Sequence, residues 1–169
     1  MYLTAGEFMD RFDAVELAQI APPASMARVT PPVMRAVILG EDTSAFPADE
    51  VDAAAAGVQR LEEALADAGQ VLDGWLAKRH TLPIDPVPGL LKRLAGNIAR
   101  FHLHDDRATE EIRKRYEDSI KTLEAISAGK MTLGLDDPSP ASSAGPVTSK
   151  TRKDRVFTDR TLADFGHGH

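Results

Sequence analysis

Residues 58–75 read VQRLEEALADAGQVLDGW. Apolar side chains recur in this stretch at steps of three and four residues, at Val58, Leu61, Leu65, Ala68, Leu72 and Trp75. That spacing places them on one face of an α-helix. It predicts a long helix that begins at Asp49 or Asp52 and ends near Arg79. The same helix contains Gly57, Gly69 and Gly74. Because glycine lowers helix propensity, a second helix that approaches closely has to stabilise this one by packing.

Two further apolar faces follow downstream. One runs from Val87 to His104 and consists of Leu90, Leu91, Leu94, Ile98 and Phe101. The other runs from about Ala108 to Ala128 and consists of Ile112, Tyr116, Ile120, Leu123 and Ile126. Prolines in the stretch His80–Pro86 predict a connector before the first of these helices. Asp105-Asp106 interrupts the pattern between the two helices, and Gly129 suits the end of the second.

The N-terminal third predicts shorter helices. Thr4 followed by Glu7 is a capping box, so a helix starts there with Phe8, Met9 and Phe12 on its apolar side. A second helix over Ala14–Ile20 presents Val15, Leu17 and Ile20, and Pro22-Pro23 ends it. Residues 22–50 read mainly as a proline-rich loop region. Pro31-Pro32 within it could open a short helix over Val33–Leu39.

These patterns predict a mainly α fold: a small helical bundle with a long central helix, spanning residues 1–135, plus an extended C-terminal arm. The three long apolar faces supply its expected core, namely Leu65, Leu72, Leu91, Leu94, Ile98, Phe101, Ile112, Tyr116, Ile120 and Leu123. At 169 residues with 43% apolar and 5% aromatic side chains, the chain is long enough for one aliphatic core.

The composition after Leu135 changes. Residues 136–149 contain three Pro and four Ser and predict a flexible linker. Residues 150–169 combine basic with apolar side chains, which a free tail does not need, and therefore predict an arm that docks on a partner. Its expected contact residues are Lys150, Arg152, Lys153, Arg155, Val156, Phe157, Arg160, Leu162 and Phe165.

The sequence argues against catalysis and against a cofactor. The chain has no Cys, which excludes disulfides, thiolate nucleophiles and Cys-bound metals. His102 and His104 are two residues apart and point to different faces of a helix, so they are poorly placed to share a metal ion. Paired acids such as Glu62-Glu63 and Glu110-Glu111 lie in charged, solvated stretches without a His or Lys to complete a site. We expect no catalytic, cofactor or metal site.

Charge and hydropathy exclude further classes. The net charge of −6 disfavours general binding to nucleic acid, since phosphate contacts require clustered Lys and Arg. The first residues lack the basic start and apolar run of a signal peptide, and no apolar stretch is long enough to span a bilayer.

Three segments together resemble the small head-completion proteins of Mu-like phages and prophages. They are Met1-Tyr2-Leu3-Thr4 through Phe12, then Val71-Leu72-Asp73-Gly74-Trp75 through Arg79 with Leu82-Pro83, and then Val87-Pro88-Gly89-Leu90-Leu91 through Asp118 and on to Leu135. The resemblance covers most of residues 1–135, is weak over 22–50, and does not extend into the arm.

The resemblance implies a structural protein of the virion, without catalytic residues, that acts as a head–tail adaptor, or connector. Such adaptors form a ring of roughly twelve copies below the portal. The ring joins the portal to the next neck, stopper or tail-completion protein, and genomic DNA passes through it without specific binding. The expected location is the neck of the particle, assembled in the cytoplasm of the bacterial host.

A ring requires contacts between copies. The expected contact residues are charged: Glu62, Glu63, Arg107, Glu110, Arg113, Arg115 and Glu117. The alternative is a soluble helical regulatory or antitoxin-like module that uses Arg107–Arg115 as a recognition helix. Acidic side chains interrupt that segment, which disfavours the alternative.

Overall fold

The computed structural model describes residues 1–134, and this part of the chain is helical, without a strand. Its elements are α1 (Ala5–Phe12), α2 (Ala14–Ile20), α3 (Pro31–Leu39), α4 (Ala48–Leu76), α5 (Gly89–His104), the short 3-10 helix η1 (Asp105–Arg107) and α6 (Glu110–Ser127). The predicted mainly α bundle with a long central helix is thus confirmed. None of these helices is long and apolar enough to cross a membrane.

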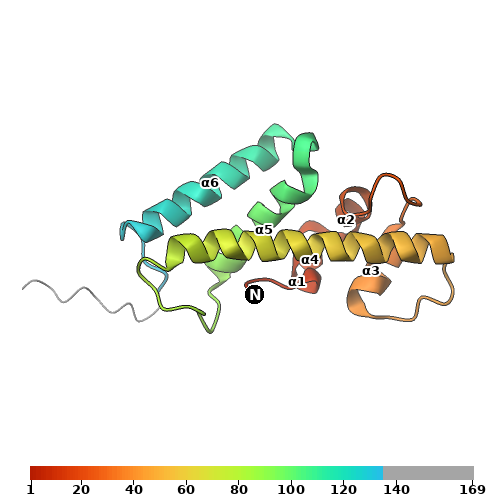
Figure 1. Cartoon of the computed structure of the whole chain (residues 1–169), viewed down its shortest axis with the longest axis horizontal. Helices are drawn as coiled ribbons and strands as arrows, with labels where there is room; N and C mark the ends of the chain where they lie inside the picture. The colour runs from red at the N-terminus through yellow and green to blue at the C-terminus, as the bar shows by residue number, and fades with distance from the viewer. Residues whose placement is uncertain (135–169) are drawn as a thin grey trace, which may run out of the picture. The chain divides into compact units, whose positions relative to one another are not determined.

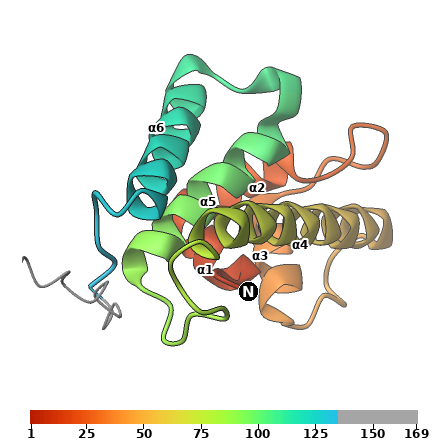
Figure 2. The ribbon, with the colours of Figure 1, turned by 60° about the vertical axis from the view of Figure 1, so that its left-hand side comes forward.

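The long helix α4 organises the helical unit, which spans Met1–Leu135. Helix α5 packs against it most extensively, and α3, α6, α2 and α1 also contact it. Figure 1 shows α4 running the length of the unit, with α6 inclined to it, and Figure 2 shows α5 lying between α6 and the short N-terminal helices. Helices α5 and α6 are joined through η1 and pack on each other.

One continuous core lies between these helices. Leu61, Leu72 and Leu76 of α4 are completely buried, as are Leu91 and Ile98 of α5. The N-terminal helices contribute Phe8, Leu17 and Met34. Aromatic side chains are scarce there, as the composition predicts.

Most of the residues expected in the core are buried. They are Leu65, Leu72, Leu91, Leu94, Ile98, Ile112 and Leu123. Phe101, Tyr116 and Ile120 are only half-buried. The rings of Phe101 and Tyr116 stack on each other, with centroids 4.2 Å apart, so the two aromatic side chains shield one another near the surface.

Several sequence expectations need correction. Val15 is 47% exposed and does not share the buried face of Leu17 and Ile20, because α2 has only seven residues and buries one narrow side. Trp75 is half-buried at the end of α4, where Lys78 lies 5.5 Å from its ring. Helix α4 itself ends at Leu76, before Arg79.

The region 22–50 contains the helix that the two prolines favour. Pro31 and Pro32 occupy the first positions of α3, where the missing N–H groups leave no hydrogen bond unmade. Gly40 ends the helix in the left-handed conformation at φ 67°, and its N–H donates to the carbonyls of Ala36 and Val37. The remaining residues on both sides of α3 form turns and loops.

Three side chains of the first sixteen residues make polar contacts with distant helices. The Tyr2 hydroxyl donates to Asp73 on α4, and burial together with this bond raises the pKa of the Tyr2 phenol above its ordinary value. Lys92 donates to Glu7 at 2.5 Å, and Arg100 donates to Glu16 at 2.6 Å. These contacts add directional bonds to the apolar packing of α1 and α2.

Glu7 completes the predicted capping box. Its carboxylate accepts from the N–H of Thr4 at 3.0 Å, while its own N–H donates to the Thr4 hydroxyl at 3.2 Å. The Lys92 ammonium, followed by the Thr4 N–H, lowers the pKa of Glu7 below its ordinary value. A group whose pKa is lowered on folding stabilises the protein above its unfolded pKa and loses that effect as the pH falls.

We therefore predict a pH-dependent effect of Glu7→Gln. The amide retains a capping oxygen but loses the ionic contact with Lys92. Both side chains are more than a third exposed, at 40% and 35%, so water screens the pair. The expected loss in the free energy of unfolding is about 0.5 kcal/mol at neutral pH. Urea denaturation should show that loss disappearing as the pH falls through about 4. A difference that stays constant with pH would contradict this assignment.

The three glycines of α4 differ in their surroundings. A Cβ atom at Gly57 would lie 3.1 Å from the Pro22 nitrogen and 3.2 Å from the Ala21 carbonyl carbon, so the residues that directly follow α2 approach α4 closely there. Gly74 has nothing within 4 Å of the same position. The expected close crossing thus occurs at Gly57 and not at Gly74.

This difference predicts opposite effects of the same substitution. Gly57→Ala should lower the free energy of unfolding by roughly 1 kcal/mol, because fixed backbone atoms would have to move. Gly74→Ala should raise it by up to about 1 kcal/mol, since alanine favours helix and meets open space. Urea denaturation of both variants checks the pair. Equal shifts of the two midpoints would show that the residues directly following α2 do not restrict Gly57.

Candidate interaction surfaces

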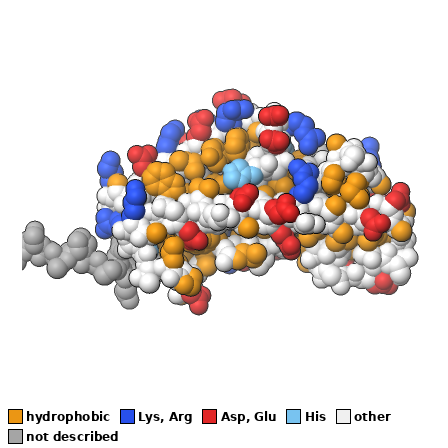
Figure 3. All heavy atoms as spheres, viewed as in Figure 1, with side chains coloured by type: hydrophobic (Ala, Val, Ile, Leu, Met, Phe, Trp, Pro, Cys, Tyr) orange, Lys and Arg blue, Asp and Glu red, His pale blue; other side chains and the backbone are white. Residues whose placement is uncertain are grey.

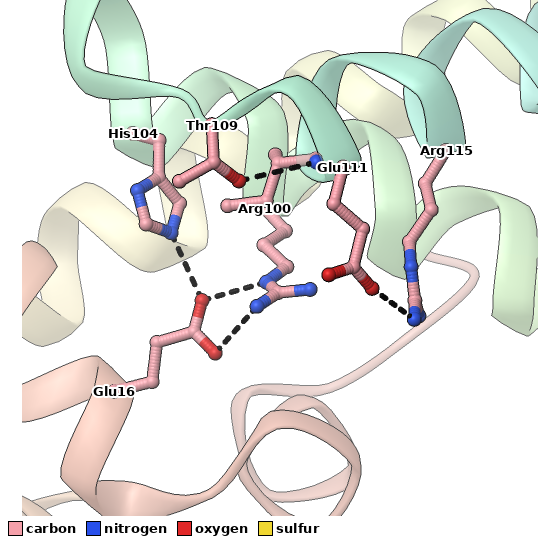
Figure 4. A network of polar contacts seen from close by, with 7 residues as sticks. Glu16, Arg100, His104, Thr109, Glu111 and Arg115 are labelled. Atoms are coloured by element: carbon pink, nitrogen blue, oxygen red, sulfur yellow. Dashed lines mark hydrogen bonds and ion pairs between the residues drawn. The ribbon is translucent and has the colours of Figure 1, made fainter.

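A polar network links α2 to α5. Arg100 donates two hydrogen bonds to the Glu16 carboxylate, from Nε at 2.6 Å and from Nη2 at 2.9 Å. His104 Nε2 lies 2.9 Å from the same carboxylate (Figure 4). The three side chains are between 13% and 22% exposed, so the network is largely shielded from water. It joins positions 16 and 104 and fixes one wall of a surface groove.

We call this hollow the arginine groove. It is an open space of about 510 Å³ between α1, the start of α2, α5 and α6. Its lining includes four arginines, Arg11, Arg93, Arg100 and Arg115, and two acids, Glu16 and Asp118. Arg100 is paired with Glu16, and Arg115 donates to Glu111 at 2.6 Å. Arg11 and Arg93 are exposed and have no ion pair within residues 1–134.

The floor of the arginine groove is held by uncharged contacts. Asn97 donates to the Ser119 hydroxyl at 3.2 Å, and that hydroxyl donates to the Arg115 carbonyl at 2.7 Å. Ser119 is the buried polar side chain of the described chain, and these bonds satisfy it. A Cβ atom at Gly96 would lie 3.1 Å from the Phe12 ring, so the small residue lets α1 approach α5 closely. These contacts hold α6 and α1 against α5 beneath the groove.

A second charged surface runs along α4, and we call it the acidic stripe. Its exposed residues are Asp52, Gln59, Glu62, Glu63, Asp67 and Gln70, with alanines between them. Arg60 is the basic residue of Ala48–Leu76, and its guanidinium donates to the Ala21 carbonyl at 2.7 Å. Figure 3 shows acidic side chains along the face over α4, whereas most Lys and Arg side chains on this face lie toward its edge. The acidic stripe therefore carries carboxylates without counter-charges of its own.

Comparison with known proteins gives the family. The family model described as Bacteriophage Mu, Gp36 matches residues 2–150. The chain belongs to the bacteriophage Mu gp36 family. The match covers the whole helical unit and the predicted linker 136–149, and it ends where the predicted arm begins.

Two relatives show how far the similarity within the gp36 family extends. The chain is 44% identical over 78 residues to the Mu-like prophage FluMu protein gp36 of Haemophilus influenzae, which covers 46% of this chain and 55% of that protein. It is 39% identical over 104 residues to Gene product J of Escherichia phage Mu, which covers 62% of this chain and 74% of that protein. The chain thus spans about half the length of the first relative.

The residues expected to contact other copies are all exposed in this gp36 family member. Glu62 and Glu63 belong to the acidic stripe, and Arg107 lies in η1. Glu110, Arg113 and Glu117 lie on α6, and Arg115 faces the arginine groove while pairing with Glu111. The structure therefore places two of these residues on α4 and the other five on η1 and α6. The nine residues expected in the docking arm, Lys150 to Phe165, lie outside the described residues.

The basic segment of the alternative hypothesis is mixed in charge. Its basic residues Arg113 and Arg115 share the exposed surface of α6 with Glu110 and Glu111. Arg115 forms an ion pair with Glu111. The segment does not form a continuous basic face. No observation on residues 1–134 favours a recognition helix here.

The arginine groove was not predicted. Arg93, Asn97 and Arg100 recur at steps of four and three, so the sequence does place them on one helix face. That signal predicts a polar face on α5, but it does not show that α1 and α6 form the other walls. The pairing of Glu16 with a side chain 84 positions away cannot be derived from periodicity.

The two helix-end histidines of α5 have separate surroundings. His104 contacts Glu16, whereas the ring of His102 lies 6.3 Å from that of Tyr116. Within the described part of the chain, no group of three or more His, Asp or Glu side chains is arranged to hold a metal ion.

Proposed function

We propose that this gp36 family member is a structural head–tail adaptor of a tailed phage. In this proposal it forms a ring below the portal, joins the portal to the next neck, stopper or tail-completion protein, and continues the DNA channel. The observation that carries the proposal is the family match over residues 2–150, together with relatives from phage Mu and a Mu-like prophage.

The helical unit supports a role that depends on surfaces. Its core is aliphatic, and its buried polar side chain, Ser119, serves the contact between α5 and α6. The polar network of Glu16, Arg100 and His104 ties helices together and is paired within itself. These buried and half-buried polar groups thus hold the fold, and we propose that the protein is not an enzyme.

The charge distribution supports assembly with other subunits. A ring forms when two different surfaces of one copy meet those of its neighbours and the rotation closes. The arginine groove and the acidic stripe are two such surfaces of opposite sign. The net charge of −6 also suits a channel that DNA passes without binding, because acidic groups repel phosphate. We place the protein in the neck of the virion, after assembly in the host cytoplasm.

The proposal is tested with the full chain and the portal protein of the same phage. Native mass spectrometry of the complex should show one adaptor for each portal subunit, and therefore roughly twelve copies in a ring. The portal alone serves as the control for its own stoichiometry. Any other ratio, or a chain that does not bind the portal, counts against the proposal.

A further inference from the structure

We propose that the arginine groove of one copy binds the acidic stripe of a second copy of this chain. The inference rests on the proposed ring and names the contact that closes it. It predicts a repeating interface. The acidic stripe of each copy binds the arginine groove of one neighbour, and its own groove binds the stripe of the other neighbour.

The arginine groove offers cations that the fold does not neutralise. Arg100 and Arg115 have carboxylate partners at 2.6 Å in the same copy. Arg11 and Arg93 line the groove with exposed guanidinium groups, and neither has an ion pair among the described residues. A guanidinium binds a carboxylate through two parallel N–H groups, so an acidic surface is the chemistry that these two side chains fit.

The acidic stripe offers the complementary groups. Glu62, Glu63 and Asp67 are exposed on adjacent turns of α4, without an ion pair in residues 1–134. Gln59 donates to Glu63 at 3.2 Å, which orients that carboxylate without neutralising it. Ala66 and Gly69 beside them are small, so another surface can approach this part of the helix closely. A rigid helix with projecting carboxylates suits an open groove.

The placement of the two surfaces fits a heterologous contact. The lining of the arginine groove contains no residue of α4, and the acidic stripe is the exposed face of that helix. One copy can therefore use its groove and its stripe at the same time, each toward a different neighbour. Such head-to-tail contacts produce rings when the rotation between copies closes.

Charge reversal provides the test. The groove variant is Arg11→Glu with Arg93→Glu, and the stripe variant is Glu62→Arg with Glu63→Arg, all in the full chain. All four residues are exposed, so circular dichroism should show that both variants fold. Each variant alone places like charges at every contact and should self-associate at least about a hundredfold more weakly than the wild type.

An equimolar mixture of the two variants should recover assembly. The reversed groove of one then meets the reversed stripe of the other, and the two unaltered surfaces also match, so an alternating ring has attraction at every contact. The matched control is Lys114→Glu with Lys130→Glu, which changes the charge by the same amount outside the groove lining and should leave assembly unchanged. Native mass spectrometry of each sample with the portal reads the copy number.

Covalent trapping reads the contact directly, because the chain contains no Cys. With Thr122→Cys in the groove and Ala66→Cys on the stripe, oxidation of the portal complex should give a ladder of linked adaptors on a non-reducing gel. Replacing Ala66→Cys by Ser44→Cys, on the loop before α4, should abolish the ladder.

The outcomes separate this inference from the proposed function. A wild-type ring on the portal, with no ladder and no recovery in the mixture, overturns the contact and leaves the adaptor proposal standing. The groove then has another anionic occupant, such as DNA phosphate. A wild-type chain that forms no ring on the portal overturns both.

Discussion

Leu94→Ala is expected to lower the free energy of unfolding by roughly 2–5 kcal/mol. Leu94 is 2% exposed on α5, the helix that packs on both α4 and α6. Removing its side chain withdraws apolar surface from the core and leaves a cavity between helices that other contacts hold in place. Because the Asn97–Ser119 bond fixes α5 to α6 one turn away, the site has little freedom to collapse.

Urea denaturation followed by circular dichroism measures this loss. Leu39→Ala is the matched control, since Leu39 is 46% exposed at the end of α3 and its truncation should cost less than about 0.5 kcal/mol. If Leu94→Ala costs no more than the Leu39 variant, the described packing of α5 is wrong.

Truncation after Leu135 is expected to abolish attachment to the portal while leaving the helical unit folded. The core residues of the unit all precede this position, so the thermal midpoint should stay close to that of the full chain. Attachment should be lost because we propose that residues 150–169 dock on the portal or another neck protein through Val156, Phe157, Leu162 and Phe165. Aromatic anchors and arginines dominate such contacts.

The truncated protein is tested by complementation of a phage that lacks the gene. DNA-filled heads without tails are the expected product in electron micrographs. The full chain with Phe157→Ala and Phe165→Ala should show the same defect and isolates the apolar anchors from chain length. Normal yields of joined particles from the truncated protein would show that the arm is not required.

Local signals in the sequence predict where the helices lie. Thr4, Pro31 and Gly40 act on their own neighbours, through a side-chain cap, a fixed φ and a left-handed turn, so their effects can be derived without the fold. The three- and four-residue spacing of α4 likewise reports its buried face. Helix α4 ends at Leu76, before the expected Arg79, because the apolar face that predicts it stops at Trp75 and gives no signal for the residues beyond.

The candidate site depends on contacts that no local pattern encodes. Glu16 and His104 are 88 positions apart, and the arginine groove exists only because α1 and α6 flank α5. The sequence did indicate Glu62, Glu63 and Arg115 as charged surface residues. It could not show that Arg100 is neutralised inside its own copy while Arg11 and Arg93 are not.

The polar contacts of the N-terminal segment with α4 and α5 set an order of events during synthesis. Tyr2, Glu7 and Glu16 reach partners 71, 85 and 84 positions later in the chain. The residues of α1 and α2 therefore leave the ribosome well before α4 is complete and before α5 is synthesised. Phe8 and Leu17, completely buried in the finished protein, lack part of their cover during that interval. The nascent chain consequently presents apolar side chains to chaperones, and its N-terminal helices complete their polar contacts only after residue 100 has emerged.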